Sequence, residues 1–215
     1  MTAVTDFRPH ASETEVEAKL LIPDRKTLDE LKRCERMAGF ALGPGTPHAV
    51  RDTYLDTRTR ALLGAGFACR RREQAGRIIM TMKGTSTAGD AIHRRREMEV
   101  ELTADAPPAL WPVSEARDAA VRIIGSEALV ALFRIRQDRF VREAFDGRRA
   151  VAVVSIDEVA VEGTAGGSGW REMEIELVPG GGEKDLAAVV AWARSRFNLV
   201  PSLLSKFERA LQAHP

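Results

Sequence analysis

Strict alternation of charged and apolar residues near the N-terminus constrains the fold of this chain more than any other feature. Residues 15–20 read EVEAKL, with a charged residue at every odd position and an apolar residue at every even position. Successive side chains of a β-strand point to opposite faces of a sheet, so a period of two predicts a strand with one charged and one apolar face. Residues 66–73, 92–102 and 170–178 show the same separation. The fold must therefore accommodate at least four strands of this kind.

The charged faces carry both signs, and their members are Glu15, Glu17, Lys19, Arg70, Arg72, Arg95, Glu97, Glu99, Glu101, Glu172, Glu174 and Glu176. The ordinary interpretation is that such a face meets water while the apolar face packs on the core. Repeated stripes of like charge argue against it, because neighbouring like charges about 4 Å apart repel by about 1 kcal/mol in water and about 4 kcal/mol near a protein surface. The alternative is that the charged faces line the inside of a barrel.

The remaining segments complete an α+β pattern. Helices are predicted at 24–38 (capped by Asp24 and ended by Gly39), 114–124, 126–133, 184–197 and 202–213. Further strands are predicted at 50–56, 77–83, 135–143, 149–156 and 159–161. Short strands joined by turns favour a large antiparallel sheet that can close into a barrel, with helices beside it. Residues 1–12 are expected to form a loose tail, 84–90 and 163–169 to be loops, and 13–215 to form a single domain.

Composition excludes several classes of protein. Lys and Arg total 32 and Asp and Glu total 31, a formal net charge of +1, which argues against nucleic acid as a partner. The chain has no apolar run long enough to span a membrane and no apolar N-terminal signal. Cys34 and Cys69 are too far apart for a zinc motif, and they predict a reducing, cytoplasmic location. A P-loop motif is absent from the sequence.

Acidic and basic residues sharing one cavity have a specific chemical meaning. Clustered carboxylates need a cation, and oxygen ligands alone suit Mg²⁺ or Mn²⁺. Arginine and lysine in the same cavity need an anion, and the arginine fork matches phosphate oxygens. The combination describes a site for a metal-bound polyphosphate.

A set of motifs resembles the CYTH superfamily, also called the triphosphate tunnel metalloenzymes. The ExExK pattern of residues 15–19 is followed in the family's order by YLDT (54–57), GFACRRR (66–72), TMK (81–83), RRE (95–97), Asp157, EMEIE (172–176) and SK (205–206). The resemblance covers about residues 13–210, and residues 81–102 and 202–211 are most similar to bacterial inorganic triphosphatases. It implies an eight-stranded antiparallel tunnel that binds triphosphates with Mg²⁺ or Mn²⁺.

The resemblance also implies roles for individual residues. The metal ligands would be Glu15, Glu17, Glu97, Asp157, Glu172 and Glu174. The phosphate-binding residues would be Lys19, Arg70, Arg72, Lys83, Arg95, Arg139 and Lys206, and the catalytic residues would include Glu15, Glu17 and Lys19. Arg136 or Arg142 could replace Arg139, because alternation in that strand is poor. Glu101 is expected at the rim, whereas the directions of Glu99 and Glu176 stay open.

Five single residues are given simpler interpretations. His93 is expected at the surface and Cys69 in a core. Trp170 is expected to pack in a core, with the tunnel mouth as the alternative. Arg94 and Arg96 are expected to face solvent, because parity places Arg95 inward.

The expected function is metal-dependent hydrolysis of a terminal phosphoanhydride bond in inorganic triphosphate (tripolyphosphate). The alternatives are a thiamine triphosphatase, a class IV adenylate cyclase, or a polyphosphate- or nucleotide-binding module without catalysis. The only expected partner is a small-molecule triphosphate, bound by a monomer or homodimer.

Overall fold

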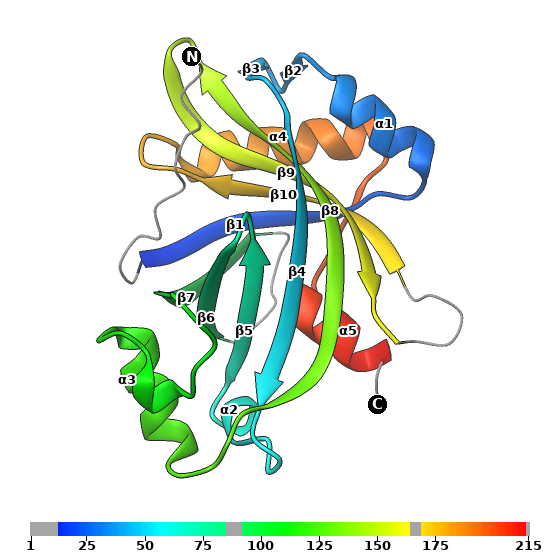
Figure 1. Ribbon diagram of the computed structural model, residues 1–215. Coiled ribbons are helices and arrows are strands. Elements are labelled where there is room, and N and C mark those ends of the chain that lie inside the picture. The colour runs from blue at the N-terminus through cyan, green and yellow to red at the C-terminus, as the bar shows by residue number, and fades with distance from the viewer. Residues whose placement is uncertain (1–12, 85–91, 164–168, 214–215) are drawn as a thin grey trace.

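The computed structural model describes residues 13–84, 92–163 and 169–213, and its centre is a closed antiparallel barrel of eight long strands (Figure 1). Around the barrel the strands follow the order β8-β4-β5-β6-β7-β1-β10-β9, and β9 pairs with β8 to close it. The strands are β1 (Glu13–Leu21), β4 (Thr46–Asp56), β5 (Phe67–Gln74), β6 (Arg77–Gly84), β7 (Ile92–Leu102), β8 (Val130–Asp146), β9 (Arg149–Val161) and β10 (Gly169–Leu177). The prediction of an eight-stranded antiparallel barrel is confirmed.

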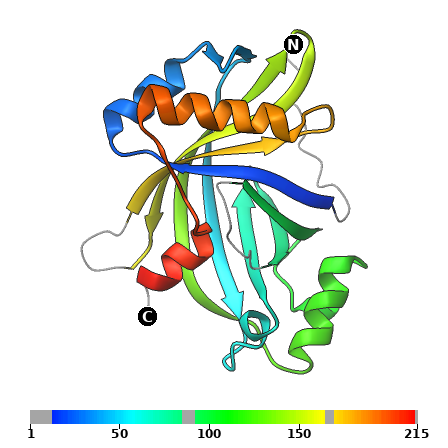
Figure 2. The same cartoon turned by 180° about the vertical axis from the view of Figure 1, so that it is seen from behind.

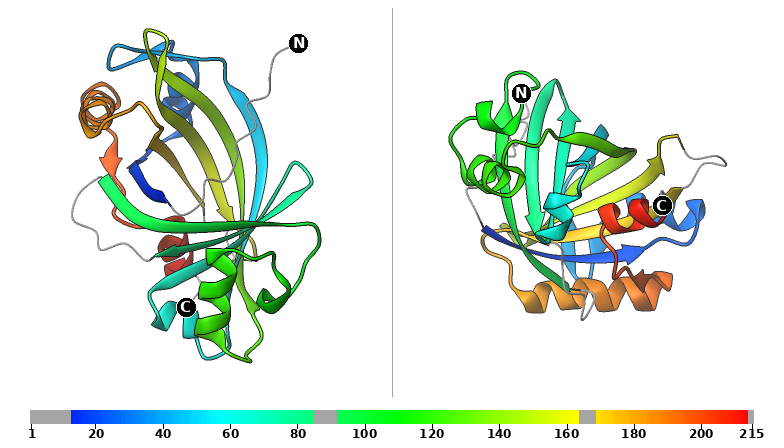
Figure 3. Two further views of the ribbon diagram at one scale, coloured as in Figure 1. Left: turned by 90° about the vertical axis from the view of Figure 1, so that its left-hand side faces the viewer. Right: turned by 90° about the horizontal axis from the view of Figure 1, so that it is seen from below.

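Helices flank the barrel on several sides. They are α1 (Arg25–Arg33), α2 (Ala61–Gly64), the 3-10 helix η1 (Pro108–Leu110), α3 (Glu115–Ile124), α4 (Glu183–Phe197) and α5 (Lys206–Ala213). From behind, α4 lies across β1 and β10 (Figure 2). Figure 3 shows from two further directions how the strands curve, with α3 beside β6 and β7 and α5 against β8.

Capping residues set the starts of two helices as the sequence predicts. The side chain of Asp24 accepts a hydrogen bond from the backbone N–H of Thr27 at 2.7 Å. The Ser114 hydroxyl accepts one from the N–H of Arg117 at 3.2 Å. Each bond satisfies a donor that a helix N-terminus would otherwise leave unpaired.

The first helix ends earlier than predicted. It stops at Arg33, and the short strands β2 (Arg36–Met37) and β3 (Phe40–Leu42) follow as a hairpin that extends the sheet beside β8. Gly39, expected to end the helix, lies instead in the hairpin turn with φ +91°. Arg142 holds the segments on either side of this hairpin by binding the carbonyls of Lys32 and Leu42 at 3.3 Å and that of Gly43 at 2.7 Å.

One further predicted helix does not form, and another begins later than predicted. In place of the helix expected at 126–133, residues 126–129 have no regular structure and β8 starts at Val130, where the strand pairs with β4 and buries Phe133. The last helix starts at Lys206 rather than 202, since Val200–Pro201 forms a short strand, β11, beside β1. Tertiary pairing decides both cases over local helix propensity. The tail expected at 1–12 and most of the loops expected at 84–90 and 163–169 lie outside the described residues.

The apolar strand faces point outward, toward the helices. Ala18 and Leu20 of β1 pack with Leu28 of α1 and Val189 of α4 in one core. A second core joins Cys69 and the methionines of β6 and β7 to α3, as expected for Cys69. Because side chains alternate along each strand, the charged faces point into the barrel. The barrel therefore has an apolar outer surface under the helices and a charged interior.

Candidate functional site

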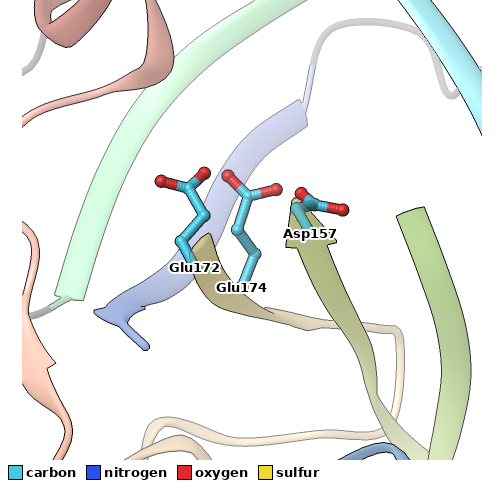
Figure 4. A group of neighbouring side chains, drawn as sticks. All are labelled: Asp157, Glu172 and Glu174. Carbon is cyan, nitrogen blue, oxygen red and sulfur yellow. The ribbon is translucent and has the colours of Figure 1, made fainter. Parts of the chain in front are cut away.

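The inner face of β9 and β10 carries a group of three carboxylates, which we call the acid cluster: Asp157, Glu172 and Glu174. Figure 4 shows the three side chains reaching the same region from the two strands. Each offers an oxygen, and these oxygens all lie within 4.8 Å of one another. Asp157 and Glu172 are opposite each other in the β9–β10 register, and both are 0% exposed. Antiparallel pairing thus brings together residues that are distant in the sequence.

Three cations neutralise the acid cluster. The Lys206 ammonium lies 3.0 Å from Asp157 and 2.8 Å from Glu174, and it also contacts Glu172. Arg139 binds both oxygens of Asp157, at 2.9 and 2.6 Å, and reaches Glu174 at 2.7 Å. Lys19 lies 3.3 Å from Glu174. Burial by itself would raise the pKa of Glu174, but these three cations hold it well below its usual value.

A second charged group occupies the inner face of β1, β6 and β7. Lys83 lies 2.7 Å from Glu97 and 3.2 Å from Glu15. Arg95 donates to Glu15 at 3.0 Å and also to Glu17, which in turn lies 3.2 Å from Lys19. The Lys19 contact links this group to the acid cluster.

The pKa values of Glu15 and Glu97, the two glutamates that contact Lys83, are shifted in opposite directions. Burial would raise the pKa of Glu15, but Lys83 and Arg95 hold that pKa well below its usual value. For Glu97, burial prevails and raises the pKa to about 7 although Lys83 opposes it. Glu15 therefore strongly prefers the ionised form, whereas the neighbouring Glu97 does not.

A third group lies on β4, β5, β6 and β8. Arg72 donates two hydrogen bonds of 2.8 Å to Asp52, and Gln137 donates to the same carboxylate at 2.7 Å. Arg70 lies 3.6 Å from Glu99 and binds Thr81 at 3.1 Å. The sequence assigned no role at the site to Asp52, Thr81 or Gln137. Strand parity could have indicated Asp52: it lies two residues before Tyr54, so both side chains leave the same face of the strand.

The structure decides the directions that the sequence left open. Glu99 points inward and accepts from Thr81 at 2.8 Å. Glu176 lies opposite Glu17 in the β1–β10 register, and burial raises its pKa to about 8. Glu101 is exposed and paired with Arg77, as expected of a rim residue. Arg94 and Arg96 are exposed, as predicted, and bind Glu183 and Glu115 on the flanking helices.

Of the three candidate arginines on β8, Arg139 is the one that reaches the acid cluster. Arg136 is exposed on the outer face, and Arg142 holds the carbonyls near the first helix. The prediction of a surface position for His93 is wrong. Its side chain is buried inside the barrel, with Nε2 3.0 Å from the carbonyl of Ser202, because it shares the inward parity of Arg95.

One end of the barrel interior is filled by apolar side chains. The rings of Tyr54, Phe133 and Phe207 pack with centroids 5.1, 5.3 and 5.8 Å apart, and Phe207 comes from α5. Trp170 packs against this group, and its indole N–H binds Glu172. The sequence showed no aromatic cluster, because its members are far apart along the chain.

The acid cluster fits a hard divalent cation. It offers only carboxylate oxygens, the ligand type that Mg²⁺ and Mn²⁺ prefer. The Lys206 ammonium lies among the same oxygens, so a metal ion bound by all three carboxylates would take over its place. Glu15, Glu17 and Glu97 belong to the neighbouring group on β1 and β7.

Comparison with solved structures shows the fold. A candidate adenylyl cyclase from Hippeastrum, described as having a dominant triphosphatase activity, superposes with a TM-score of 0.70 at 19% identity, covering 94% of this chain and 97% of that one. A candidate adenylate cyclase from Bacillus halodurans gives 0.64 at 21% identity, with 93% and 98% covered. One from Vibrio parahaemolyticus gives 0.56 at 17%, with 93% and 98% covered.

Within the described residues, no helix combines the length and apolar character needed to cross a membrane. No curated protein sequence matches the chain. The family model of the CYTH domain matches residues 13–209, nearly the whole sequence. The chain therefore belongs to the CYTH domain family.

Proposed function

We propose that this protein hydrolyses a terminal phosphoanhydride bond of inorganic triphosphate bound inside the barrel, with Mg²⁺ or Mn²⁺ as cofactor. The observation that carries the proposal is the continuous interior network of carboxylates and cations, linked through Lys19, which touches both Glu17 and Glu174. Charges this deeply buried are costly unless they are paired, and a surface or structural role would not require so many. A metal-bound polyanion uses both signs.

The phosphate oxygens would be held by the interior cations: Lys19, Arg70, Arg72, Lys83, Arg95, Arg139 and Lys206. All seven already contact interior carboxylates or the Thr81 hydroxyl in the structure. Arginine forks can bind two phosphate oxygens at once, whereas lysines act as point charges. Together they would hold the phosphate chain straight for in-line attack and stabilise the charge that develops on the leaving group.

The metal would be held by carboxylates from Glu15, Glu17, Glu97, Asp157, Glu172 and Glu174. When bound, it supplies positive charge for the phosphate oxygens and activates water. Glu15 and Glu17 lie on β1 beside Arg95 of β7, and Glu17 also contacts Lys19; from there they would orient the attacking water. Lys19 lies between Glu17 and Glu174 and would bind a phosphate oxygen there.

The filled end of the barrel supports a compact substrate. Phe207 packs on Tyr54 and Phe133, so the chain itself occupies the apolar surface that an organic group could use. Triphosphatase activity is described for the Hippeastrum protein of the same fold. The free thiols of Cys34 and Cys69 fit a cytoplasmic setting.

A phosphate-release panel tests the proposal. The full chain would be incubated with tripolyphosphate, thiamine triphosphate, ATP or long-chain polyphosphate, each with Mg²⁺ and with Mn²⁺. We expect the highest kcat/KM with tripolyphosphate and no release in the presence of a chelator. Cyclic AMP from ATP would support a cyclase instead, faster release from thiamine triphosphate would change the substrate, and tight binding without turnover would support a binding module.

A further inference from the structure

Trp170 contacts one of the acid-cluster carboxylates directly. It lies on β10 two residues before Glu172, so both side chains leave the same face of the strand. The indole Nε1–H donates a hydrogen bond of 2.7 Å to Oε2 of Glu172. The Glu172 side chain is fully buried, so water does not compete for this bond.

The two oxygens of Glu172 have different partners. Oε2 accepts from Trp170, whereas Oε1 contacts the Lys206 ammonium among the oxygens of Asp157 and Glu174. The terminal torsion of a glutamate is broad, so an unrestrained carboxylate would rotate freely. An indole N–H carries no formal charge and can only donate, which means that it orients Glu172 without neutralising it.

The indole ring is itself held in place. The Arg209 guanidinium lies over the ring at 5.6 Å from its centroid, and Arg209 also donates to the Ser202 hydroxyl at 3.1 Å. Arg209 and Lys206 both belong to α5, three residues apart, so they share one side of the helix. Helix α5 therefore reaches Glu172 twice, directly through Lys206 and indirectly through Arg209 and Trp170.

We infer that Trp170 is a positioning residue for the cation site: its N–H fixes one oxygen of Glu172 and leaves the other directed toward a divalent cation shared with Asp157 and Glu174. The inference rests on the proposed metal-binding function of the acid cluster. Groups that orient a metal ligand typically change metal affinity by about 10- to 100-fold when they are removed. Trp170 belongs to none of the motifs that relate this chain to its family.

The test replaces Trp170 by Phe, which keeps an aromatic ring but removes the N–H donor together with part of the indole. We expect the Trp170→Phe dissociation constant for Mn²⁺, measured by isothermal titration calorimetry on the full chain, to rise about 10- to 100-fold. Trp192→Phe is the matched control, because Trp192 packs edge-on against Phe197 of α4, at a centroid distance of 5.4 Å, away from the acid cluster. Its Mn²⁺ affinity should equal that of the wild type.

A second measurement covers a Trp170→Phe variant that fails to fold. In the ¹⁵N-labelled wild type, the indole N–H resonance of Trp170, assigned by elimination with Trp111→Phe and Trp192→Phe, should shift when Mg²⁺ is added. The Trp192 resonance should stay in place. Equal Mn²⁺ affinity of wild type and Trp170→Phe, or an unmoved Trp170 resonance at saturating Mg²⁺, overturns the inference. A wild type that binds no Mn²⁺ contradicts the metal proposal itself.

Discussion

Arg72 and Asp52 form a bidentate ion pair inside the barrel, with both hydrogen bonds at 2.8 Å and the Asp52 side chain completely buried. The pair fixes the direction of the Arg72 guanidinium before any ligand arrives. Gln137 completes the arrangement by donating to the same carboxylate at 2.7 Å. Asp52 thus holds Arg72, a proposed phosphate-binding residue, in a set position. Because the ion pair is buried, the charge of Asp52 is also important for the stability of the fold.

The first prediction concerns Asp52→Asn and pH. Burial would raise the pKa of Asp52, but Arg72 lowers it below the value in the unfolded chain. A lowered folded-state pKa contributes stability above the unfolded value of about 3.9, and this contribution is lost as the pH falls below it. We expect Asp52→Asn to unfold about 3 kcal/mol more easily at pH 7 and to lose less stability than the wild type below about pH 4. Urea unfolding at several pH values measures both.

Asp138→Asn is the control for this charge, because Asp138 is an exposed aspartate on the outer side of the adjacent strand β8. It should leave the pH dependence of stability nearly unchanged. An Asp52→Asn protein whose stability falls in acid as steeply as that of the wild type would contradict the role given to this ion pair.

The second prediction concerns Arg72→Ala. If the guanidinium binds phosphate, its loss should reduce kcat/KM for tripolyphosphate by about tenfold or more, since a hydrogen bond to a charged group contributes about 1.5–3 kcal/mol. Steady-state phosphate release measures the effect. Arg71→Ala is the control on the same strand, because Arg71 points outward and binds Glu73 and Asp105. An unchanged kcat/KM in Arg72→Ala would remove Arg72 from the substrate site.

The third prediction concerns Glu17→Gln. Glu17 is 3% exposed and lies between Arg95 and Lys19, where the proposal places it as a metal ligand. Gln keeps the shape and one acceptor oxygen but loses the charge. Mg²⁺-dependent phosphate release should fall by about 100-fold, while the far-UV circular dichroism spectrum stays that of the wild type.

Glu101→Gln is the control for Glu17→Gln, because Glu101 is exposed and its partner is Arg77. Its turnover should match that of the wild type. Wild-type turnover in Glu17→Gln would show that Glu17 is not a metal ligand.

How far the sequence predicts the site depends on strand parity. Period-two alternation correctly places Glu17, Lys19, Arg95 and Glu172 inside the barrel, because the side-chain direction follows from the backbone alone. It also predicts the outward positions of Arg94 and Arg96.

Strand parity does not identify site residues on strands that lack clear alternation. Asp52 was missed because β4 buries both of its faces near this residue, and nothing local marks an aspartate whose partners are on β5 and β8. His93 was misjudged because the neighbouring arginines suggested a surface, although its parity with Arg95 indicated the interior. The start of β8 was misassigned because pairing with β4 overrides local helix propensity.

The last prediction concerns competition between Lys206 and a metal ion. The Lys206 ammonium contacts all three acid-cluster carboxylates, so Lys206→Met would leave buried negative charge without its main partner. Breaking a buried ion pair costs about 3–5 kcal/mol, and the metal-free variant should be destabilised by about that amount. A divalent cation restores the missing charge and no longer has to displace an ammonium group. Mn²⁺ should therefore raise the melting temperature of Lys206→Met more than that of the wild type.

Thermal unfolding with and without Mn²⁺ measures this difference, and Lys184→Met, an exposed lysine on α4, is the control. The result separates two roles for Lys206. If it only binds phosphate, Mn²⁺ should stabilise variant and wild type equally in the absence of tripolyphosphate. If it occupies the cation position, as the structure places it, the gain from Mn²⁺ must be larger in the variant, because stabilisation by a ligand grows with its affinity for the folded state.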